Sequence, residues 1–296
     1  MAWQQLVIEL GSLDPETVEA VLAELGAASV TLSDSGDNPV LEPAPGETPL
    51  WPATRLTALF EAVHDLDRVA ADVAHCLGID ALPAYRLETL EDRDWEREWL
   101  RDFGPMRFGA RLWVCPRGAQ APDADAVIVE LDPGLAFGTG THPTTALCLA
   151  WLDSLPLEGK TVIDYGAGSG ILAIAALKLG ARRALAYDID PQAVIATREN
   201  AEANGVADRL EVTLRKDDLE HPADVVIANI LAGPLIELAT EILDLTITGG
   251  TLALSGILSE QVPEVSRAYA SGLRLDPPAY QDQDGQTWAR LTGIRL

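Results

Sequence analysis

The sequence of 296 residues contains only three cysteines, Cys76, Cys115 and Cys148, and they lie far apart with no C-x-x-C spacing. A disulfide framework needs an even and denser set of cysteines, and a structural zinc site needs closely spaced ligands. The sequence therefore excludes both, and we expect no metal site. So sparse a set of thiols is typical of a reducing compartment.

Basic residues are also scarce, because 21 Lys and Arg stand against 46 Asp and Glu, a formal net charge of −25. Affinity for nucleic acid comes mostly from neutralised phosphates, so we expect no direct binding to RNA or DNA. A basic partner would instead be drawn in by long-range attraction. On composition alone, the acidity is interpreted as a solubility feature.

Long apolar runs are missing too. The longest, which starts at Ile171, ends at Lys178, well short of the roughly 20 residues of a membrane-spanning helix. The first ten residues lack the basic and apolar segments of a signal peptide. We therefore expect no membrane partner and a cytoplasmic location.

The length is about twice that of a usual single domain, so two domains are expected. In the first 90 residues, Asp14-Pro15 and Gly26 delimit one predicted helix, and turn-forming residues separate the other elements. The resulting order β-α-β-β-α-β is typical of a ferredoxin-like α+β domain, predicted over residues 1–90. The predicted strands are 3–10, 28–32, 55–62 and 85–90, and the predicted helices are 14–25 and 67–77.

Much of the acidic excess falls in this first part. Residues 1–85 hold fourteen acidic side chains and two basic ones, Arg55 and Arg68. Residues 91–104 are predicted to form a helical linker, in which Trp95, Trp99 and Phe103 recur at a spacing of four residues. We interpret this aromatic stripe as packing against a neighbouring domain rather than as a ligand site.

From Pro105 onward, strands alternate with helices, which predicts an α/β domain over residues 105–296 with a mostly parallel, seven-stranded sheet covered on both faces. Ligands of such sheets bind at the carboxyl ends of the strands. Strand-like segments at 107–114 and 127–131 precede this series. The seven strands are predicted at 161–165, 183–189, 211–215, 224–230, 250–257, 273–280 and 287–295, and the helices at 142–155, 169–179, 191–204, 232–243 and 260–271.

The segment VIDYGAGSG, residues 162–170, runs from an apolar strand through three alternate glycines into a helix. Glycines let the backbone approach a ligand closely, and the helix N-terminus then faces that ligand. The spacing is G-x-G-x-G rather than the G-x-G-x-x-G of dinucleotide sites. Asp164 just before the loop suits a cationic ligand such as a sulfonium. A tight structural turn remains the alternative. Gly166 and Gly168 are the candidate ligand-binding positions.

Two further polar residues follow neighbouring strands. Asp188 lies 22 residues beyond Gly166, where a carboxylate can accept both ribose hydroxyls of an adenosine. Its alternative role as a helix N-cap suits Asp190 better, because Pro191 follows. Asn229 ends an apolar strand over the same crevice and offers a carbonyl acceptor to an attacking amine. For Asn229 the N-cap alternative is equally compatible with the spacing.

Residues 131–145, LDPGLAFGTGTHPTT, combine glycine and proline breaks with one aromatic residue and four threonines. A loop of this kind, feeding a helix, can fold over a bound cofactor and exclude water. Thr144 and Thr145 fall in the first turn of that helix.

These segments, together with AYDIDPQAV, ANILA and PMRFGARLWVCP, resemble the PrmA-type methyltransferases, which modify the eleventh large-subunit ribosomal protein. The resemblance extends over essentially the whole chain. It implies a class I, Rossmann-like methyltransferase domain and S-adenosyl-L-methionine as the cofactor. The substrate amines would be lysine side chains and the N-terminus of a basic ribosomal protein, recognised by the N-terminal domain. Ala167 departs from many relatives, which carry cysteine there.

Carried over by motif, the resemblance assigns cofactor binding to Thr145, Gly166, Asp188 and Asn229, with Phe137 in a covering loop. Asn229 is also the candidate catalytic residue, acting by positioning the amine. We find no dedicated base; His142, the nearest candidate, precedes Pro143 and is interpreted as a loop anchor or a helix cap. Two alternatives are an NAD-dependent oxidoreductase, disfavoured by the glycine spacing, and a binding module without activity.

Overall fold

The computed structural model describes residues 3–36, 51, 53–90, 104–119, 123, 125–131, 140–219 and 221–296. The chain divides into two compact units, Met1–Glu98 and Trp99–Leu296, and each is described here by itself. Residues 91–103, predicted as a helical linker, lie outside the described residues, as do residues 132–139 with Phe137.

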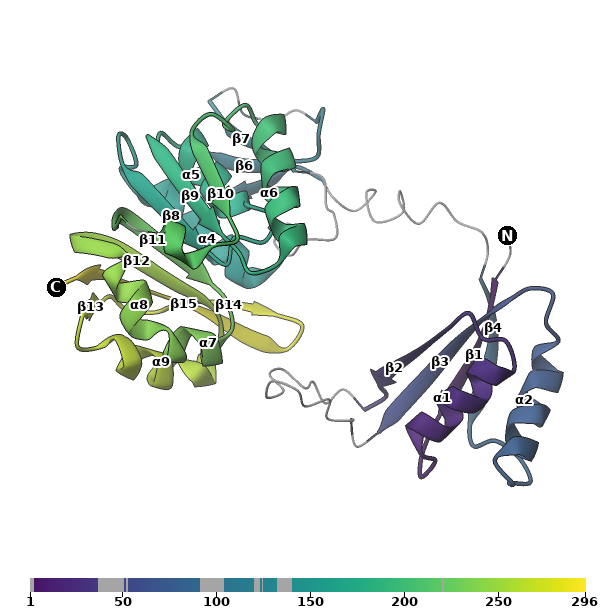
Figure 1. Cartoon of the computed structure of the whole chain (residues 1–296). Helices are drawn as coiled ribbons and strands as arrows, with labels where there is room; N and C mark the ends of the chain where they lie inside the picture. Colours follow the sequence, from purple (N-terminus) through teal and green to yellow (C-terminus); the bar gives the residue numbers. More distant parts are fainter. Residues whose placement is uncertain are drawn as a thin grey trace. The chain divides into compact units, whose positions relative to one another are not determined.

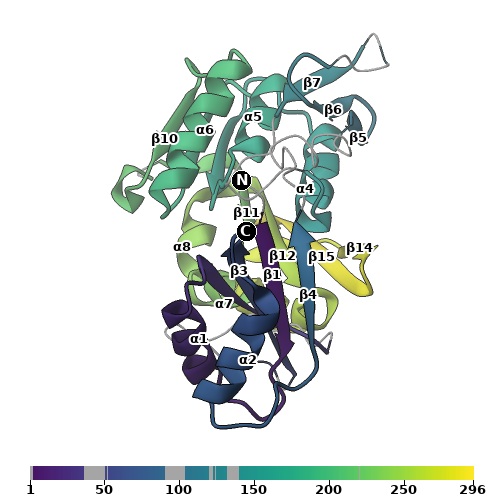
Figure 2. The same cartoon turned by 90° about the vertical axis from the view of Figure 1, so that its right-hand side faces the viewer.

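The first unit pairs a four-stranded antiparallel sheet with two helices (Figure 1). The strand order is β2-β3-β1-β4, so the two middle strands are β3 and β1. Both helices cover one face of this sheet, as the turned view makes plain (Figure 2). The elements are β1 (Trp3–Glu9), α1 (Pro15–Glu24), β2 (Ser29–Asp34), β3 (Thr54–Glu61), α2 (Leu66–Cys76) and β4 (Tyr85–Leu90).

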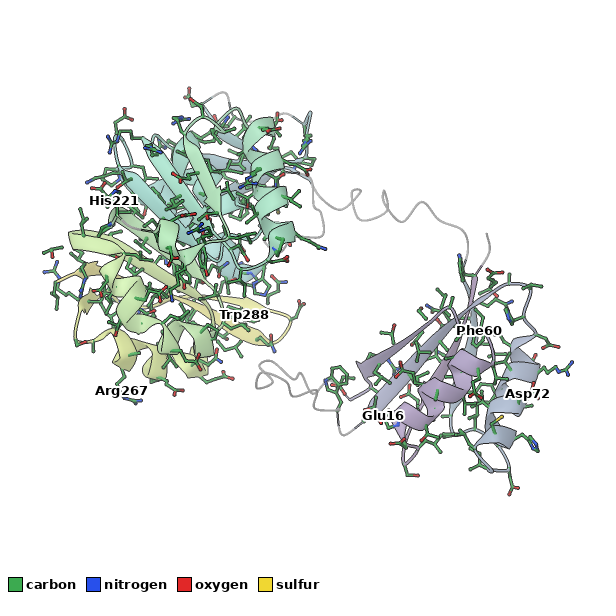
Figure 3. All side chains as sticks on the ribbon, in the orientation of Figure 1. Glu16, Phe60, Asp72, His221, Arg267 and Trp288 are labelled. Carbon is green, nitrogen blue, oxygen red and sulfur yellow. The ribbon has the colours of Figure 1, made fainter. Side chains whose placement is uncertain are left out.

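The sequence defines this unit through its caps and its alternation. Asp14 caps α1 by accepting a hydrogen bond from the Thr17 amide at 2.9 Å, which satisfies a donor that the first helical turn leaves unpaired. Along β3 every second side chain is buried, and Phe60 lies in the core beneath the helices (Figure 3). On the other face, Arg55 donates from Nε to Glu9 Oε1 at 2.7 Å.

The second unit is built on an eight-stranded sheet with the order β10-β9-β8-β11-β12-β15-β13, in which β14 also pairs with β15. The five strands from β10 to β12 are parallel to one another, and the last three pair antiparallel. The strands are β8 (Thr161–Tyr165), β9 (Arg183–Tyr187), β10 (Leu210–Thr213), β11 (Ala223–Asn229), β12 (Thr246–Leu258), β13 (Leu273–Leu275), β14 (Ala279–Gln283) and β15 (Gln286–Arg295).

Helices cover both faces of this sheet, so its strands are apolar on both sides. One core cluster lies beneath α4 (Pro143–Ser154), α5 (Ile171–Lys178) and α6 (Pro191–Ala203). The other lies beneath α7 (Ala232–Glu237), α8 (Ala239–Asp244) and α9 (Val262–Tyr269). Short 3-10 turns, η2 (Lys216–Asp218) and η3 (Ser259–Gln261), follow β10 and β12. The carboxyl ends of the parallel strands are thereby left at one edge, where the predicted residues gather.

A smaller three-stranded sheet, β5-β6-β7, corrects the prediction of one strand over residues 107–114. The chain turns back at Gly109, which has a φ of +73°, so β5 (Met106–Phe108) and β6 (Leu112–Cys115) form a hairpin. β7 (Val127–Glu130) then pairs parallel to β6. A Cβ on Gly109 would lie 2.5 Å from Asp153 Oδ2, and the same oxygen accepts a hydrogen bond from the Arg111 amide.

The predicted seven-stranded sheet is also corrected, because the main sheet has eight strands. The predicted strand 273–280 is two strands, β13 and β14, separated by residues 276–278. Pro277 and Pro278 stand in this gap and have no backbone N–H to donate to a neighbouring strand. β14 and β15 form a hairpin whose turn is Asp284-Gly285, with φ values of +52° and +78°.

Candidate functional site

The glycine loop follows β8 directly and bends the chain into α5. Gly166, Gly168 and Gly170 have φ values of +79°, +55° and +77°, a region that other residues rarely adopt. Packing fixes two of them further. A Cβ on Gly166 would lie 2.3 Å from Ile230 Cγ2, and one on Gly170 would lie 2.6 Å from Thr197 Cγ2. The loop is therefore a tight structural turn, and its glycine positions also present bare backbone to any ligand beside it.

A pocket of about 680 Å³ opens over the carboxyl ends of β8, β9 and β11. Gly166 and Gly168 form part of its wall, and Asp188 and Asn229 also line it, so four of the predicted residues meet in one cavity. The other described residues that line it are His142, Thr144, Tyr165, Tyr187, Ile189, Lys216, Ile230, Leu231, Pro234, Leu238, Gly256 and Trp288.

Asp188 follows β9 and is half-buried. Its Oδ2 accepts a hydrogen bond from the Gly168 amide at 2.8 Å, and its Oδ1 accepts one from the Asp190 amide at 2.9 Å. Asp190 caps α6, as predicted, through the Gln192 amide at 2.8 Å. Two backbone amides therefore fix the orientation of the Asp188 side chain. Since a carboxylate offers about four acceptor positions, roughly two remain for a ligand.

Asn229 ends β11, and the structure removes its alternative role as a helix cap. The N-cap of α7 is Leu231, and Asn229 Nδ2 instead donates to Thr145 Oγ1 at 3.3 Å. Its Oδ1 is buried and has no hydrogen-bond partner among the described residues. A buried carbonyl without a donor is destabilising unless a ligand supplies one. Because Asn229 lines the pocket, a ligand with N–H groups that reaches this atom would satisfy it.

Thr145 is itself fully buried in the first turn of α4 and does not line the pocket. Its contribution to the site runs through the hydrogen bond from Asn229, whereas its neighbour Thr144 reaches the pocket wall. Phe137, the remaining predicted site residue, lies outside the described residues.

Asp164 does not face the pocket. It is fully buried between β8 and α5, where its Oδ2 accepts a hydrogen bond from the Ala173 amide at 3.1 Å. Burial raises the pKa of Asp164 to about 7, although the Ala173 amide opposes this shift. The expectation that this carboxylate attracts a cationic ligand therefore has no support in its position; its hydrogen bond fastens α5 to the sheet.

His142 caps α4, as predicted, because its ring nitrogen accepts from the Thr144 amide. Burial lowers its pKa, so the ring is neutral at pH 7. Its partner in the pocket wall is Trp288, whose ring meets that of His142 edge-on at 4.6 Å between centroids. Trp288 lies in the terminal hairpin (Figure 3) and lines the pocket, but no local motif in the sequence marks it as a site residue.

Tyr165 and Tyr187 were also missed, although both have a signal in the sequence. Each is the last residue of its strand and directly precedes a predicted site residue, Gly166 or Asp188. Both line the pocket, and their rings pack together with centroids 4.9 Å apart.

Other kinds of site are not supported. Among the described residues, no group of three or more His, Cys, Asp or Glu side chains could hold a metal ion. The helices of the described part of the chain are all too short or too polar to cross a membrane.

The mostly parallel sheet, the glycine loop and the pocket at the strand ends define a Rossmann-like α/β protein with a small-molecule site of the kind that methyltransferases use. The chain belongs to the ribosomal protein L11 methyltransferase (PrmA) family, whose model matches residues 2–295.

Individual relatives agree with this assignment, two of them over essentially the full length. The chain is 54% identical over 298 residues to the ribosomal protein L11 methyltransferase of Actinobacillus pleuropneumoniae serotype 5b, with 100% of both chains covered. It is 55% identical over 294 residues to that of Escherichia coli O81, with 99% of each covered. It also resembles the crystal structure of a ribosomal protein L11 methylase from Lactobacillus delbrueckii subsp. bulgaricus. That match has a TM-score of 0.59 and 33% identity, and it covers 65% of this chain and 99% of the other.

Proposed function

We propose that this chain transfers methyl groups from S-adenosyl-L-methionine to lysine side chains and the N-terminal amine of ribosomal protein L11, in the pocket at the carboxyl edge of its main sheet. The reaction is that of its family, a methyltransferase that acts on L11. The lysine and N-terminal amines as acceptors, and the roles of the individual residues, are the finer part of the proposal.

The residues at the edge have an order that suits an extended ligand. Asn229 ends β11, and Gly166 and Asp188 directly follow β8 and β9; these three strands are consecutive in the sheet. S-adenosyl-L-methionine, when bound, supplies an electrophilic methyl group on its sulfonium. In this arrangement Asp188 accepts from the ribose hydroxyls, while Gly166 and Gly168 let the backbone approach closely. Thr145 acts by holding Asn229 in place.

The buried Asn229 Oδ1 without a partner is the observation that carries the proposal. A carbonyl accepts an N–H from an incoming amine and so turns the lone pair of that amine toward the methyl group. The Nδ2 bond to Thr145 fixes the amide in this orientation. Positioning of this kind is a major source of rate acceleration in displacement reactions.

The acceptor must be a neutral amine, and a lysine with a pKa of about 10.4 gives up its proton at pH 7 at a cost of roughly 4–5 kcal/mol. The neutral ring of His142 has its Nδ1 engaged in capping α4, so we assign no base role to that atom. The pocket contributes instead through its apolar walls, such as Leu231 and Trp288, which disfavour the charged form of an entering amine.

The first unit is proposed to be a ferredoxin-like domain that recognises L11. Its support is the element order and the strand order β2-β3-β1-β4. Its acidic excess suits a basic ribosomal protein and disfavours direct contact with nucleic acid. The cytoplasm is the proposed location. The covering role of Phe137 stays a prediction from the resemblance.

Transfer of a labelled methyl group to purified L11, followed by mass spectrometry of the modified amines, tests the reaction. We expect incorporation at lysine side chains and the N-terminus. Calorimetry with S-adenosyl-L-methionine and NAD tests the pocket separately, and binding of NAD alone would favour an oxidoreductase. Cofactor binding without any methyl incorporation would favour a binding module.

A further inference from the structure

The edge that carries Asn229, Gly166 and Asp188 continues for one more strand. β10 lies next to β9, and Lys216, in the turn η2 that follows β10, lines the same pocket. Neighbouring strands lie about 4.8 Å apart, so the edge from β11 to β10 spans roughly 14 Å. This is about the length of an extended adenosyl compound. With the ribose at Asp188, the strand order brings the base to the Lys216 end.

The side chain of Lys216 is held in place by Glu241, a residue of α8. Its Nζ forms an ion pair with Glu241 Oε2, and Glu241 Oε1 accepts a hydrogen bond from the Tyr165 hydroxyl at 2.9 Å. Burial, followed by the contact with Glu241, raises the pKa of Tyr165, so this hydroxyl remains a donor. One carboxylate therefore fastens two side chains of the pocket wall.

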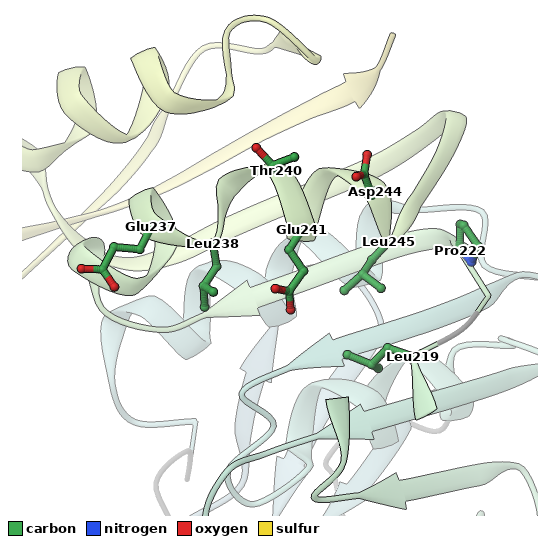
Figure 4. A pocket seen from close by; sticks show the side chains of 8 residues that line it. All are labelled: Leu219, Pro222, Glu237, Leu238, Thr240, Glu241, Asp244 and Leu245. Carbon is green, nitrogen blue, oxygen red and sulfur yellow. The ribbon is translucent and has the colours of Figure 1, made fainter. Parts of the chain in front are cut away.

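Glu241 does this from outside the pocket. It lines a second hollow of about 590 Å³, where it points from α8 toward Leu219 (Figure 4). Leu238 lines both hollows and is part of the partition between them. Because Glu241 lies behind the wall, it can orient Lys216 without contacting a ligand in the first pocket.

A lysine ammonium has three N–H donors and no acceptor. One carboxylate engages part of that capacity, so donors of Lys216 remain, and Lys216 itself lines the pocket. An adenine ring presents acceptor nitrogens at N1, N3 and N7. We propose that Lys216 binds the cofactor by donating a hydrogen bond to a ring nitrogen of its adenine, and that Glu241 is a positioning residue for Lys216. This inference rests on the proposed function.

The test is calorimetric binding of S-adenosylhomocysteine to the full-length protein and to Lys216→Met. A matched control is Lys160→Met, since Lys160 pairs with Asp224 Oδ1 at 3.0 Å away from this pocket. The side chains of Lys160 and Asp224 are 45% and 24% exposed, against 49% and 26% for Lys216 and Glu241. We expect about a tenfold loss of affinity for Lys216→Met and less than a twofold change for the control.

A panel of 1-deaza, 3-deaza and 7-deaza analogues identifies the acceptor. The wild-type protein is expected to bind one analogue about tenfold more weakly, and Lys216→Met should no longer distinguish that analogue from the parent compound. Glu241→Gln still accepts from Tyr165 but cannot hold the ammonium by charge, so we expect the same discrimination to be reduced. Lys216→Arg should restore part of it.

Equal affinity of Lys216→Met and the wild type, or unchanged discrimination across the panel, would overturn this inference and leave the proposed function intact. Failure of the wild-type protein to bind S-adenosylhomocysteine would overturn both. If Lys216→Met does not fold, the affinities of Lys216→Arg and Glu241→Gln for the same analogues are measured instead. The inference is overturned if both variants distinguish the analogue from the parent compound as strongly as the wild type does.

Discussion

Asp188 offers the sharpest test of the pocket. Its carboxylate is proposed to bind the ribose of the cofactor, and it also accepts hydrogen bonds from backbone amides of the neighbouring loops. Its two oxygens accept hydrogen bonds from the Gly168 and Asp190 amides, at 2.8 and 2.9 Å. Asp188→Ala therefore removes two loop contacts together with the proposed acceptors for the ribose. The effect on ligand affinity must be separated from the effect on the loop.

The expected magnitude follows from these contacts. Two ribose hydroxyls bound to a half-buried carboxylate contribute about 2–3 kcal/mol after exchange with water, roughly a 30- to 150-fold change in Kd. The lost amide contacts add about 1–2 kcal/mol to the destabilisation of the folded state. Asp188→Asn keeps one acceptor oxygen, so we expect it to fall between the wild type and Asp188→Ala.

Calorimetry with S-adenosylhomocysteine measures the affinity, and thermal unfolding without ligand measures the stability. Asp190→Ala is the control, since Asp190 lies two residues away, is exposed and caps α6 without lining the pocket. Loss of this cap costs about 1 kcal/mol of stability but should leave Kd unchanged. The reasoning is refuted if Asp188→Ala binds within threefold of the wild type, or if Asp190→Ala weakens binding equally.

Three further predictions concern the remaining parts of the molecule. Asn229→Ala should lower the methyl-transfer rate at saturating cofactor about 100-fold, because the amine loses its positioning acceptor; a rate within threefold of the wild type would contradict this. Deleting residues 1–90 should leave S-adenosylhomocysteine binding intact, because the first unit has its own core, and should abolish methylation of L11; normal methylation would remove the recognition role. Asp164→Asn should change the pH dependence of stability. The raised pKa of Asp164, about 7, means that the folded wild type holds more protons than the unfolded chain between pH 4 and 7. It should therefore lose about 2 kcal/mol relative to the variant from pH 5.5 to pH 7.5, and parallel stability curves from urea unfolding would disprove the shift.

The elements that the sequence predicts well are those with local causes. Asp14 and Asp190 cap their helices through a hydrogen bond within three residues, each followed by a proline in the first turn. The turn at Asp284-Gly285 needs two residues with positive φ, which this pair tolerates. In such cases the physical cause and its residues lie next to each other in the chain.

The sequence predicts an element wrongly where the residue that interrupts it is distant in the chain, or where a regular hydrophobic pattern runs across the interruption. The segment 107–114 alternates like a strand, but the turn at Gly109 is fixed by Asp153, which lies more than 40 residues away. The predicted helix 232–243 is two helices, α7 and α8, with Leu238 between them in a non-helical conformation. Hydrophobic periodicity alone does not distinguish such breaks.

The same distinction divides the pocket. Gly166, Gly168 and Asp188 can be predicted from the sequence because the local backbone depends on them. The two glycines adopt positive φ, and Asp188 accepts a hydrogen bond from the neighbouring glycine loop. Lys216 and Trp288 enter the pocket only because β10 and β15 are placed by the sheet, and neither belongs to a motif.

The residues of the site differ in how freely they can vary. A substitution at Gly166 would drive a Cβ into Ile230 and disturb the sheet edge itself, so its effect on binding cannot be separated from its effect on folding. Lys216 is about half exposed, and its partner Glu241 lies behind the pocket wall. Since exposed ion pairs contribute little to stability, Lys216 can change with little loss of fold. The glycine loop should therefore constrain which class of ligand fits, while side chains such as Lys216 adjust how tightly it is held.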